Sequence, residues 1–229
     1  MAAIDYIKCM AIKVIIFDLD GTLIDSSIDI CHAINYALSG LNVQPVTVPE
    51  TISLIGEGIT RLFEKIMDTH GLRYDRTLLI DRFLEYYSAH LIDNTTLYPG
   101  VVDTLEALAG YRKAVISNKR EDLSAKALQH LGLSRYFDLI VGSDTTAERK
   151  PSPVPINYVL SRLGIGHEEA MIVGDSTYDI NAGRAAGILT VAVTYGYRPA
   201  DTLRGADFLV SSMPEILDVL NGTRNKASL

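Results

Sequence analysis

The chain has 229 residues, of which 48% are hydrophobic and 21% are charged, and this globular composition excludes a disordered or fibrous protein. Its formal net charge of −7 argues against nucleic acid or an anionic membrane as the main partner, because both are polyanions. The N-terminus lacks a long apolar core and no later run of about eighteen apolar residues follows, so we expect a protein that is neither secreted nor membrane-spanning.

The first predicted element is a buried strand at residues 14–17, where the apolar run is continuous and rich in β-branched residues. The next 70 or so residues carry helical patterns and no convincing strand. The three helices that these patterns predict span residues 28–38, 59–70 and 77–90. A helical insertion after the first strand is the simplest account of this segment.

The insertion ends at a strong turn signal, the sequence Tyr98-Pro99-Gly100. We therefore expect a helical cap domain formed by residues 25–96. The remaining residues, 1–24 and 97–229, are expected to form one α/β catalytic core. The polar tail after Asn221 is expected to be frayed.

The core resumes with a helix and then alternates between short apolar runs and amphipathic patterns. Strands are predicted at 114–116, 139–141, 171–173 and 189–193, with a weak last strand at 208–210. Helices are predicted at 101–109, 121–131, 154–163 and 179–186. This alternation predicts an α/β fold with a doubly wound parallel sheet of the Rossmann-like kind.

Polar residues follow directly after the predicted strands, at the sheet edge where open parallel sheets bind ligands. Asp18 and Asp20 end the first strand, and Gly21 then lets the chain turn away. One carboxylate can attack phosphorus to form an acyl-phosphate. The other can protonate the leaving oxygen and later take a proton from the hydrolytic water. Ser143, at the end of a further strand, is interpreted as structural.

The other strand ends carry groups that can stabilise charge on a phosphoryl group. Ser117 and Asn118 offer donors for phosphate oxygens, and Lys150 offers a cation. Asp175, with Asp18, offers oxygen ligands to a hard cation, and Mg²⁺ fits this chemistry because it shares its coordination with substrate phosphate.

Four short motifs occur along the chain in the same order as in haloacid dehalogenase-like hydrolases, and the sequence resembles that family. They are Asp18-x-Asp20-Gly21-Thr22, Ser117-Asn118, Lys150-Pro151 and Gly174-Asp175-x-x-x-Asp179. The resemblance implies Asp18 as nucleophile, Asp20 as general acid and base, and Lys150 as the catalytic cation. It implies Thr22, Ser117 and Asn118 as substrate-binding residues. It also implies a Mg²⁺ site at Asp18, Asp175 and Asp20, the last through its backbone carbonyl, with Asp179 behind it as an orienting group.

The predicted cap resembles the caps that close over small phosphorylated metabolites. Its Gly56-Glu57-Gly58 sequence, followed by Arg61, is similar to the specificity loop of phosphoglycolate phosphatases, although the same glycines fit an ordinary turn before a helix. Lys119 and Arg61 are candidate contacts for a substrate carboxylate. The resemblance therefore favours 2-phosphoglycolate as substrate.

Two other functions remain open on the sequence alone. A sugar-phosphate mutase resembling β-phosphoglucomutase shares the core motifs, and a non-catalytic phosphate-sensing module could keep the fold without turnover. Cys9 and Cys31 lack the spacing of a metal or redox motif and are expected to be buried free thiols, which suits a cytoplasmic location. The expected assembly is a monomer or a homodimer.

Overall fold

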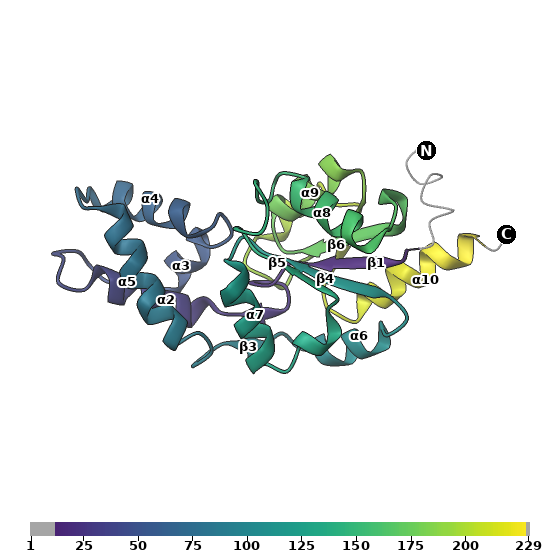
Figure 1. Ribbon diagram of the computed structural model, residues 1–229, viewed down its shortest axis with the longest axis horizontal. Helices are drawn as coiled ribbons and strands as arrows, with labels where there is room; N and C mark the ends of the chain where they lie inside the picture. Colours follow the sequence, from purple (N-terminus) through teal and green to yellow (C-terminus); the bar gives the residue numbers. More distant parts are fainter. Residues whose placement is uncertain (1–11, 228–229) are drawn as a thin grey trace.

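The computed structural model describes residues 12–227, with the backbone alone for residues 223–227, and its centre is a six-stranded sheet in the order β5-β4-β1-β6-β7-β8 (Figure 1). The strands are β1 (Val14–Phe17), β4 (Arg112–Ile116), β5 (Leu139–Val141), β6 (Ala170–Gly174), β7 (Leu189–Val193) and β8 (Phe208–Val210). Every neighbouring pair is parallel. The predicted fold class is confirmed.

Helices cover both faces of this sheet, which is why its central strand β1 is apolar throughout. One face packs against α6 (Val101–Ala107), α7 (Glu121–His130) and α10 (Glu215–Ala227), and the other against α8 (Val154–Leu163) and α9 (Thr177–Ala186). In β1, Ile15 and Phe17 join the first of these cores, whereas Val14 and Ile16 join the second. The continuous apolarity of β1 is therefore a consequence of two-sided burial. Short 3₁₀ turns lie at Ser134–Tyr136, His167–Glu169 and Ala200–Leu203.

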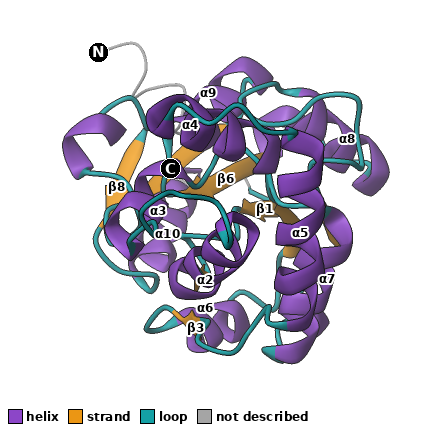
Figure 2. Ribbon diagram, turned by 90° about the vertical axis from the view of Figure 1, so that its left-hand side faces the viewer, coloured by secondary structure: helices purple, strands orange, loops and turns teal. Residues whose placement is uncertain are grey.

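The helical segment between β1 and α6 lies beyond the carboxyl end of β1, to the left in Figure 1 and toward the viewer in Figure 2. Its helices are α2 (Ser27–Leu38), α3 (Val48–Leu54), α4 (Ile59–His70) and α5 (Arg76–Ala89). Three of them were predicted, and α3 was missed. A capping box formed by Thr47 and Glu50, with Pro49 in the first turn, was the local signal for this short helix.

Two very short strands, β2 (Ile24–Asp25) and β3 (Thr96–Leu97), pair antiparallel where the chain enters and leaves the helical segment. The prediction of no strand there was wrong, because two residues are too few for an apolar period to show. The pair coincides with the predicted boundaries of the cap, although the division into residues 25–96 and a core stays a prediction.

Two smaller predictions can be compared with the structure. The tail after Asn221 was expected to fray, whereas α10 continues to Ala227. Cys31 is a buried free thiol, as predicted, and donates to the backbone oxygen of Val46, while Cys9 lies outside the described residues. Within residues 12–227, every helix is too short or too polar to span a bilayer.

Candidate active site

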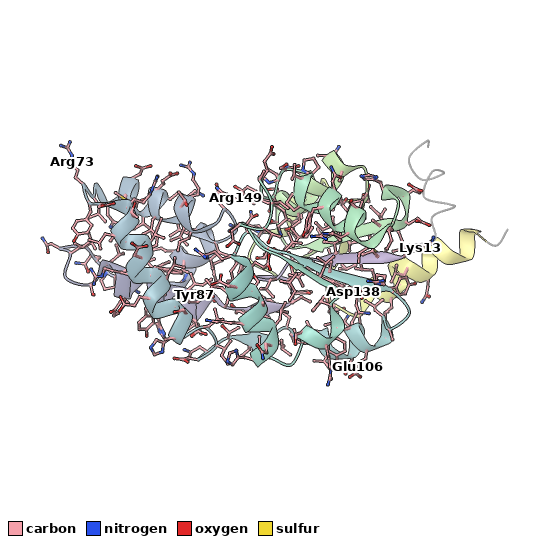
Figure 3. All side chains as sticks on the ribbon, viewed as in Figure 1. Lys13, Arg73, Tyr87, Glu106, Asp138 and Arg149 are labelled. Carbon is pink, nitrogen blue, oxygen red and sulfur yellow. The ribbon has the colours of Figure 1, made fainter. Side chains whose placement is uncertain are left out.

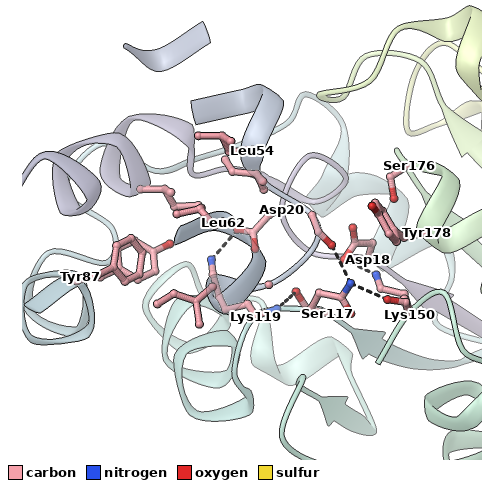
Figure 4. A pocket seen from close by; sticks show the side chains of 17 residues that line it. Asp18, Asp20, Leu54, Leu62, Tyr87, Ser117, Lys119, Lys150, Ser176 and Tyr178 are labelled. Carbon is pink, nitrogen blue, oxygen red and sulfur yellow. Dashed lines mark hydrogen bonds and ion pairs between the residues drawn. The ribbon is translucent and has the colours of Figure 1, made fainter. Parts of the chain in front are cut away.

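The parallel sheet brings the predicted chemical groups to one edge (Figure 4). Asp18 follows β1, Ser117 follows β4 and Asp175 follows β6, and these three strands are adjacent in the order β4-β1-β6. Figure 4 labels Asp18 and Ser117. All three side chains are buried. Residues up to 157 positions apart in the sequence, from Asp18 to Asp175, therefore meet at the carboxyl end of the sheet.

Lys150 is the centre of a buried ion-pair network. Its Nζ lies 2.7 Å from a carboxylate oxygen of Asp18 and 2.6 Å from one of Asp179, and its side chain is 2% exposed. Burial acts to lower the pKa of Lys150, but the charges of Asp179 and Asp18 outweigh it and raise the pKa above its ordinary value. The lysine therefore stays protonated and places a permanent cation against the Asp18 carboxylate.

Three carboxylates crowd around this cation. One oxygen each from Asp18, Asp175 and Asp179 lies within 4.8 Å of the others. Burial raises the pKa of Asp18 well above its usual range in spite of Lys150, and burial with the neighbouring Asp179 raises the pKa of Asp175 to about 7. A bound cation would relieve this repulsion, and carboxylate oxygens are the ligands that Mg²⁺ prefers.

Two glycines make room for the Asp175 carboxylate. A Cβ atom on Gly21 would lie 2.3 Å from Asp175 Oδ2, and one on Gly196 would lie 2.3 Å from Asp175 Cβ. Gly21 also has a φ of 89°, which disfavours other residues. The backbone amide of Tyr197 then donates to Asp175 at 2.7 Å. The two turns thus fix the carboxylate at the acidic cluster.

Asp20 has a different environment from the other carboxylates. Its side chain accepts hydrogen bonds from Lys119 Nζ at 2.6 Å and from Ser26 Oγ at 2.5 Å. Asp20 thus faces the same cavity as Asp18 but is separate from the acidic cluster. The third carboxylate of that cluster is Asp179, which the sequence placed behind the metal site.

Of the three polar residues predicted to bind substrate, two line the cavity and one does not. Ser117 lines the cavity, and its Oγ accepts from the backbone amide of Lys119. Asn118 also lines it, but its amide nitrogen donates to the backbone oxygens of Gly56 and Lys150, at 2.7 and 3.0 Å. Asn118 therefore joins the helical segment to the core. Thr22 does not line the cavity, and its hydroxyl is buried with no partner among the described residues.

The loop predicted to determine specificity reaches the cavity only in part. Gly56 and Gly58 line the cavity, with φ angles of 111° and 80°. Glu57 and Arg61 do not line it. Arg61 is 48% exposed and pairs with Glu57 and Glu64 along α4. The structure therefore brings the two glycines to the site and leaves the two charged side chains outside it.

The cavity between sheet and helices has a volume of about 80 Å³. Its core side carries the polar residues above. Its helical side carries Ile30, Leu54, Ile55, Ile59, Leu62, Phe83 and Tyr87. The sequence analysis missed these residues, because apolar and aromatic residues at helical spacing predict a core as readily as a site. It also missed Arg198, which donates to the backbone oxygens of Ile52 and Ile55 and so ties the loop after β7 to α3.

Comparisons with known proteins agree with this geometry. A family model described as haloacid dehalogenase-like hydrolase matches residues 15–193. The chain belongs to this family. Phosphoglycolate phosphatases of Chromobacterium violaceum and Aquifex aeolicus are 40% and 39% identical to it, over 91% of the chain in both cases and over 96% and 97% of those proteins. The predicted family resemblance is confirmed.

Solved structures share this architecture over most of the chain. A predicted phosphoglycolate phosphatase from Haemophilus somnus is 32% identical with a TM-score of 0.86, and the match covers 92% of this chain and 98% of that one. CbbY from Rhodobacter sphaeroides, solved in complex with phosphate, is 25% identical with a TM-score of 0.78, over 92% and 99% of the two chains. Phosphatases of the family generally use Mg²⁺.

Proposed function

We propose that the protein is a Mg²⁺-dependent phosphatase that hydrolyses a small phosphorylated metabolite, 2-phosphoglycolate, through an aspartyl-phosphate on Asp18. The observation that carries this proposal is the pairing of Asp18 with Lys150 at one end of a cavity that Asp20 also lines. A nucleophile, a cation and an acid-base group thus face one space. Release of inorganic phosphate from a panel of phosphorylated metabolites tests the proposal.

In the first half of the reaction, a carboxylate oxygen of Asp18 attacks phosphorus and the bond between phosphorus and the ester oxygen breaks. Asp20 gives a proton to that leaving oxygen. Lys150 balances negative charge on the phosphoryl oxygens, and Ser117 donates to one of them. The alcohol leaves, and the phosphoryl group stays on Asp18.

In the second half, Asp20 takes a proton from a water molecule that attacks the phosphorus of the aspartyl-phosphate. The bond between phosphorus and the Asp18 oxygen breaks, and inorganic phosphate leaves with Asp18 regenerated. Lys119 and Ser26 fix the Asp20 carboxylate in place, so the same oxygen can serve in both halves. Covalent catalysis by one carboxylate and proton transfer by the other account for the bonds that break and form during hydrolysis.

The acidic cluster fits the metal that this reaction requires. Asp18 and Asp175 would hold Mg²⁺, with the backbone carbonyl of Asp20 as the family resemblance implies. Asp179 is bonded to Lys150 and Ser176, which suits an orienting role. When bound, Mg²⁺ neutralises charge on the phosphoryl group and brings it to the nucleophile.

The lining of the cavity favours a small substrate over the sugar phosphate that a mutase would bind. A sugar ring presents several hydroxyls that need hydrogen-bond partners, because burying unpaired polar groups is costly. The helical side offers mainly apolar side chains, such as Leu54, Leu62 and Phe83. A small metabolite, and neither nucleic acid nor a membrane, is the proposed partner of this site.

Removal of divalent metal is expected to stop phosphate release. Dialysis against a chelator should lower kcat for the best substrate to background, and added Mg²⁺ should restore it, because Asp18 and Asp175 then regain their shared cation. Ca²⁺ should restore little, since its looser coordination misplaces phosphorus and nucleophile. Undiminished turnover in exhaustively chelated protein would contradict the proposed metal site.

Gly58→Val is expected to impair the metabolite reaction more than the reaction of a small aryl phosphate. A Cβ on Gly58 would lie 3.3 Å from the backbone oxygen of Asn118, at the contact between helical segment and core. The matched control is Gly40→Val, because Gly40 has a similar φ, 84° against 80°, and nothing within 4 Å. Both variants place a side chain on a residue with positive φ, so the control accounts for that shared backbone feature, and the contact with Asn118 is present in Gly58→Val alone.

The measurement is kcat/KM for both substrates in both variants. We expect the ratio of metabolite to aryl phosphate to fall about tenfold in Gly58→Val, as for an interaction of about 1.4 kcal/mol, and to stay unchanged in Gly40→Val. Equal losses on both substrates would assign this loop to the core chemistry or to stability instead.

A further inference from the structure

Tyr87 is a buried side chain whose hydroxyl lies beside the Lys119 ammonium and has no acceptor for its own proton within the described part of the chain. The residue comes from α5 and is 1% exposed, yet it lines the cavity (Figures 3 and 4). Burial raises the pKa of Tyr87 to about 12, so the hydroxyl keeps its proton at neutral pH. Buried hydroxyls are normally paired, and an unpaired donor in a substrate cavity points to a group that the substrate brings.

Lys119 lies beside the aromatic ring of Tyr87. Its Nζ is 5.2 Å from the centre of the Tyr87 ring and 2.6 Å from Asp20, and the side chain is 8% exposed. Burial acts to lower the pKa of Lys119, and the charge of Asp20 outweighs it, so the pKa is raised. An ammonium group has three protons, and the hydrogen bond to Asp20 uses one of them.

Two other candidate cations, Lys150 and Arg61, have acidic partners of their own. Lys150 is bound by Asp18 and Asp179, and Arg61 pairs with acidic residues outside the cavity. Lys119 is therefore the cavity-lining cation that can meet an anionic group away from the phosphoryl site. The apolar residues Leu62 and Phe83 also line the cavity, and low polarity strengthens such an ion pair.

We propose that the Tyr87 hydroxyl and the Lys119 ammonium form a subsite for a carboxylate on the organic part of the substrate. The inference rests on the proposed phosphatase function and names the two side chains that recognise the carboxylate of the proposed substrate. Asp20 protonates the leaving oxygen, and Lys119 touches Asp20. A carboxylate one carbon away from that oxygen therefore reaches Lys119.

The two side chains of the subsite come from different parts of the chain, the helical segment and the core. Tyr87 belongs to α5 of the helical segment, whereas Lys119 follows β4 of the sheet. A carboxylate bound by both side chains joins the two parts across the cavity. A substrate without that group binds through the phosphoryl site alone.

Binding in the Asp18→Asn background tests the subsite without turnover. Calorimetric titrations with Mg²⁺ present compare 2-phosphoglycolate with ethyl phosphate, in which a methyl group replaces the carboxylate. We expect Tyr87→Phe and Lys119→Met each to weaken 2-phosphoglycolate binding by about 10- to 100-fold, as for one hydrogen bond to a charged group. Ethyl phosphate binding should weaken far less. The matched control is Tyr86→Phe, because Tyr86 is the next residue on α5 and stacks on Tyr36 and His90.

Each outcome bears on one of the two proposals. A preference for 2-phosphoglycolate over ethyl phosphate that falls in Tyr87→Phe and Lys119→Met, but not in Tyr86→Phe, supports the subsite. Equal binding of both ligands before any further substitution, or equal weakening of both by Tyr87→Phe, would overturn it. The phosphatase function fails on different grounds, namely the absence of phosphate release from every phosphate ester by the unmodified protein.

Discussion

Replacement of Asp18 by asparagine is expected to lower phosphate release by about 10⁴-fold or more, because an amide cannot form the acyl-phosphate that carries the phosphoryl group. The fold should remain. Burial raises the pKa of Asp18, so the folded protein holds this carboxylate at a cost that a neutral side chain avoids. Lys150 keeps its second partner, Asp179, at 2.6 Å.

Steady-state phosphate release and a thermal melt of the metal-free protein check both halves of this expectation. The melting temperature of Asp18→Asn should equal or exceed that of the parent protein. Asp81→Asn is the matched control, because Asp81 is exposed on α5 and should keep full activity. A loss of activity that accompanies unfolding would show a structural effect, and substantial activity in a folded variant would defeat the covalent route.

Replacement of Asp20 by asparagine is expected to slow the reaction by about 10²- to 10⁴-fold, the usual contribution of a general acid or base. The loss should depend on the step and on the substrate. An aryl phosphate with a good leaving group needs little protonation, so its first step should survive. Water activation is still lost, and the aspartyl-phosphate should accumulate.

Stopped-flow measurement of a nitrophenyl phosphate provides the readout. We expect Asp20→Asn to give a burst of nitrophenol of up to one equivalent, followed by a slow steady state, while the metabolite reaction shows no burst. The asparagine oxygen can still accept from Lys119 and Ser26, so the local geometry should be kept. Unchanged rates on both substrates would remove Asp20 from the proton transfers.

The sequence was sufficient to predict the sheet and the residues at its edge. Strands that are buried on both faces, such as β1 and β6, consist of a continuous run without charged residues. The carboxyl ends of parallel strands lie at the same edge of the sheet. The convergence of Asp18, Ser117 and Asp175 therefore follows from the strand pattern alone. Lys150 was predicted as a cation for the phosphoryl oxygens and then as part of the family resemblance, and its contacts with Asp18 and Asp179 fit the proposed role.

The helical side of the site was not predictable in the same way. Side chains on α4 and α5 reach the cavity through tertiary packing, and their spacing along a helix does not distinguish Tyr87 from a core residue. Charge was misleading as well, since Glu57 and Arg61 pair with each other at the surface and stay out of the cavity. Lys119, which the sequence offered together with Arg61 as a contact for a substrate carboxylate, does line the cavity.

The most direct test of the proposed mechanism is to identify the residue that carries the phosphoryl group during turnover. The protein with Mg²⁺ is mixed with excess substrate, quenched in acid within milliseconds, digested and analysed by mass spectrometry. The mechanism predicts one phosphoryl group on the peptide that contains Asp18, at no more than one per chain, and none in Asp18→Asn. Phosphate release with no labelled peptide, or with the label on another residue, would contradict it.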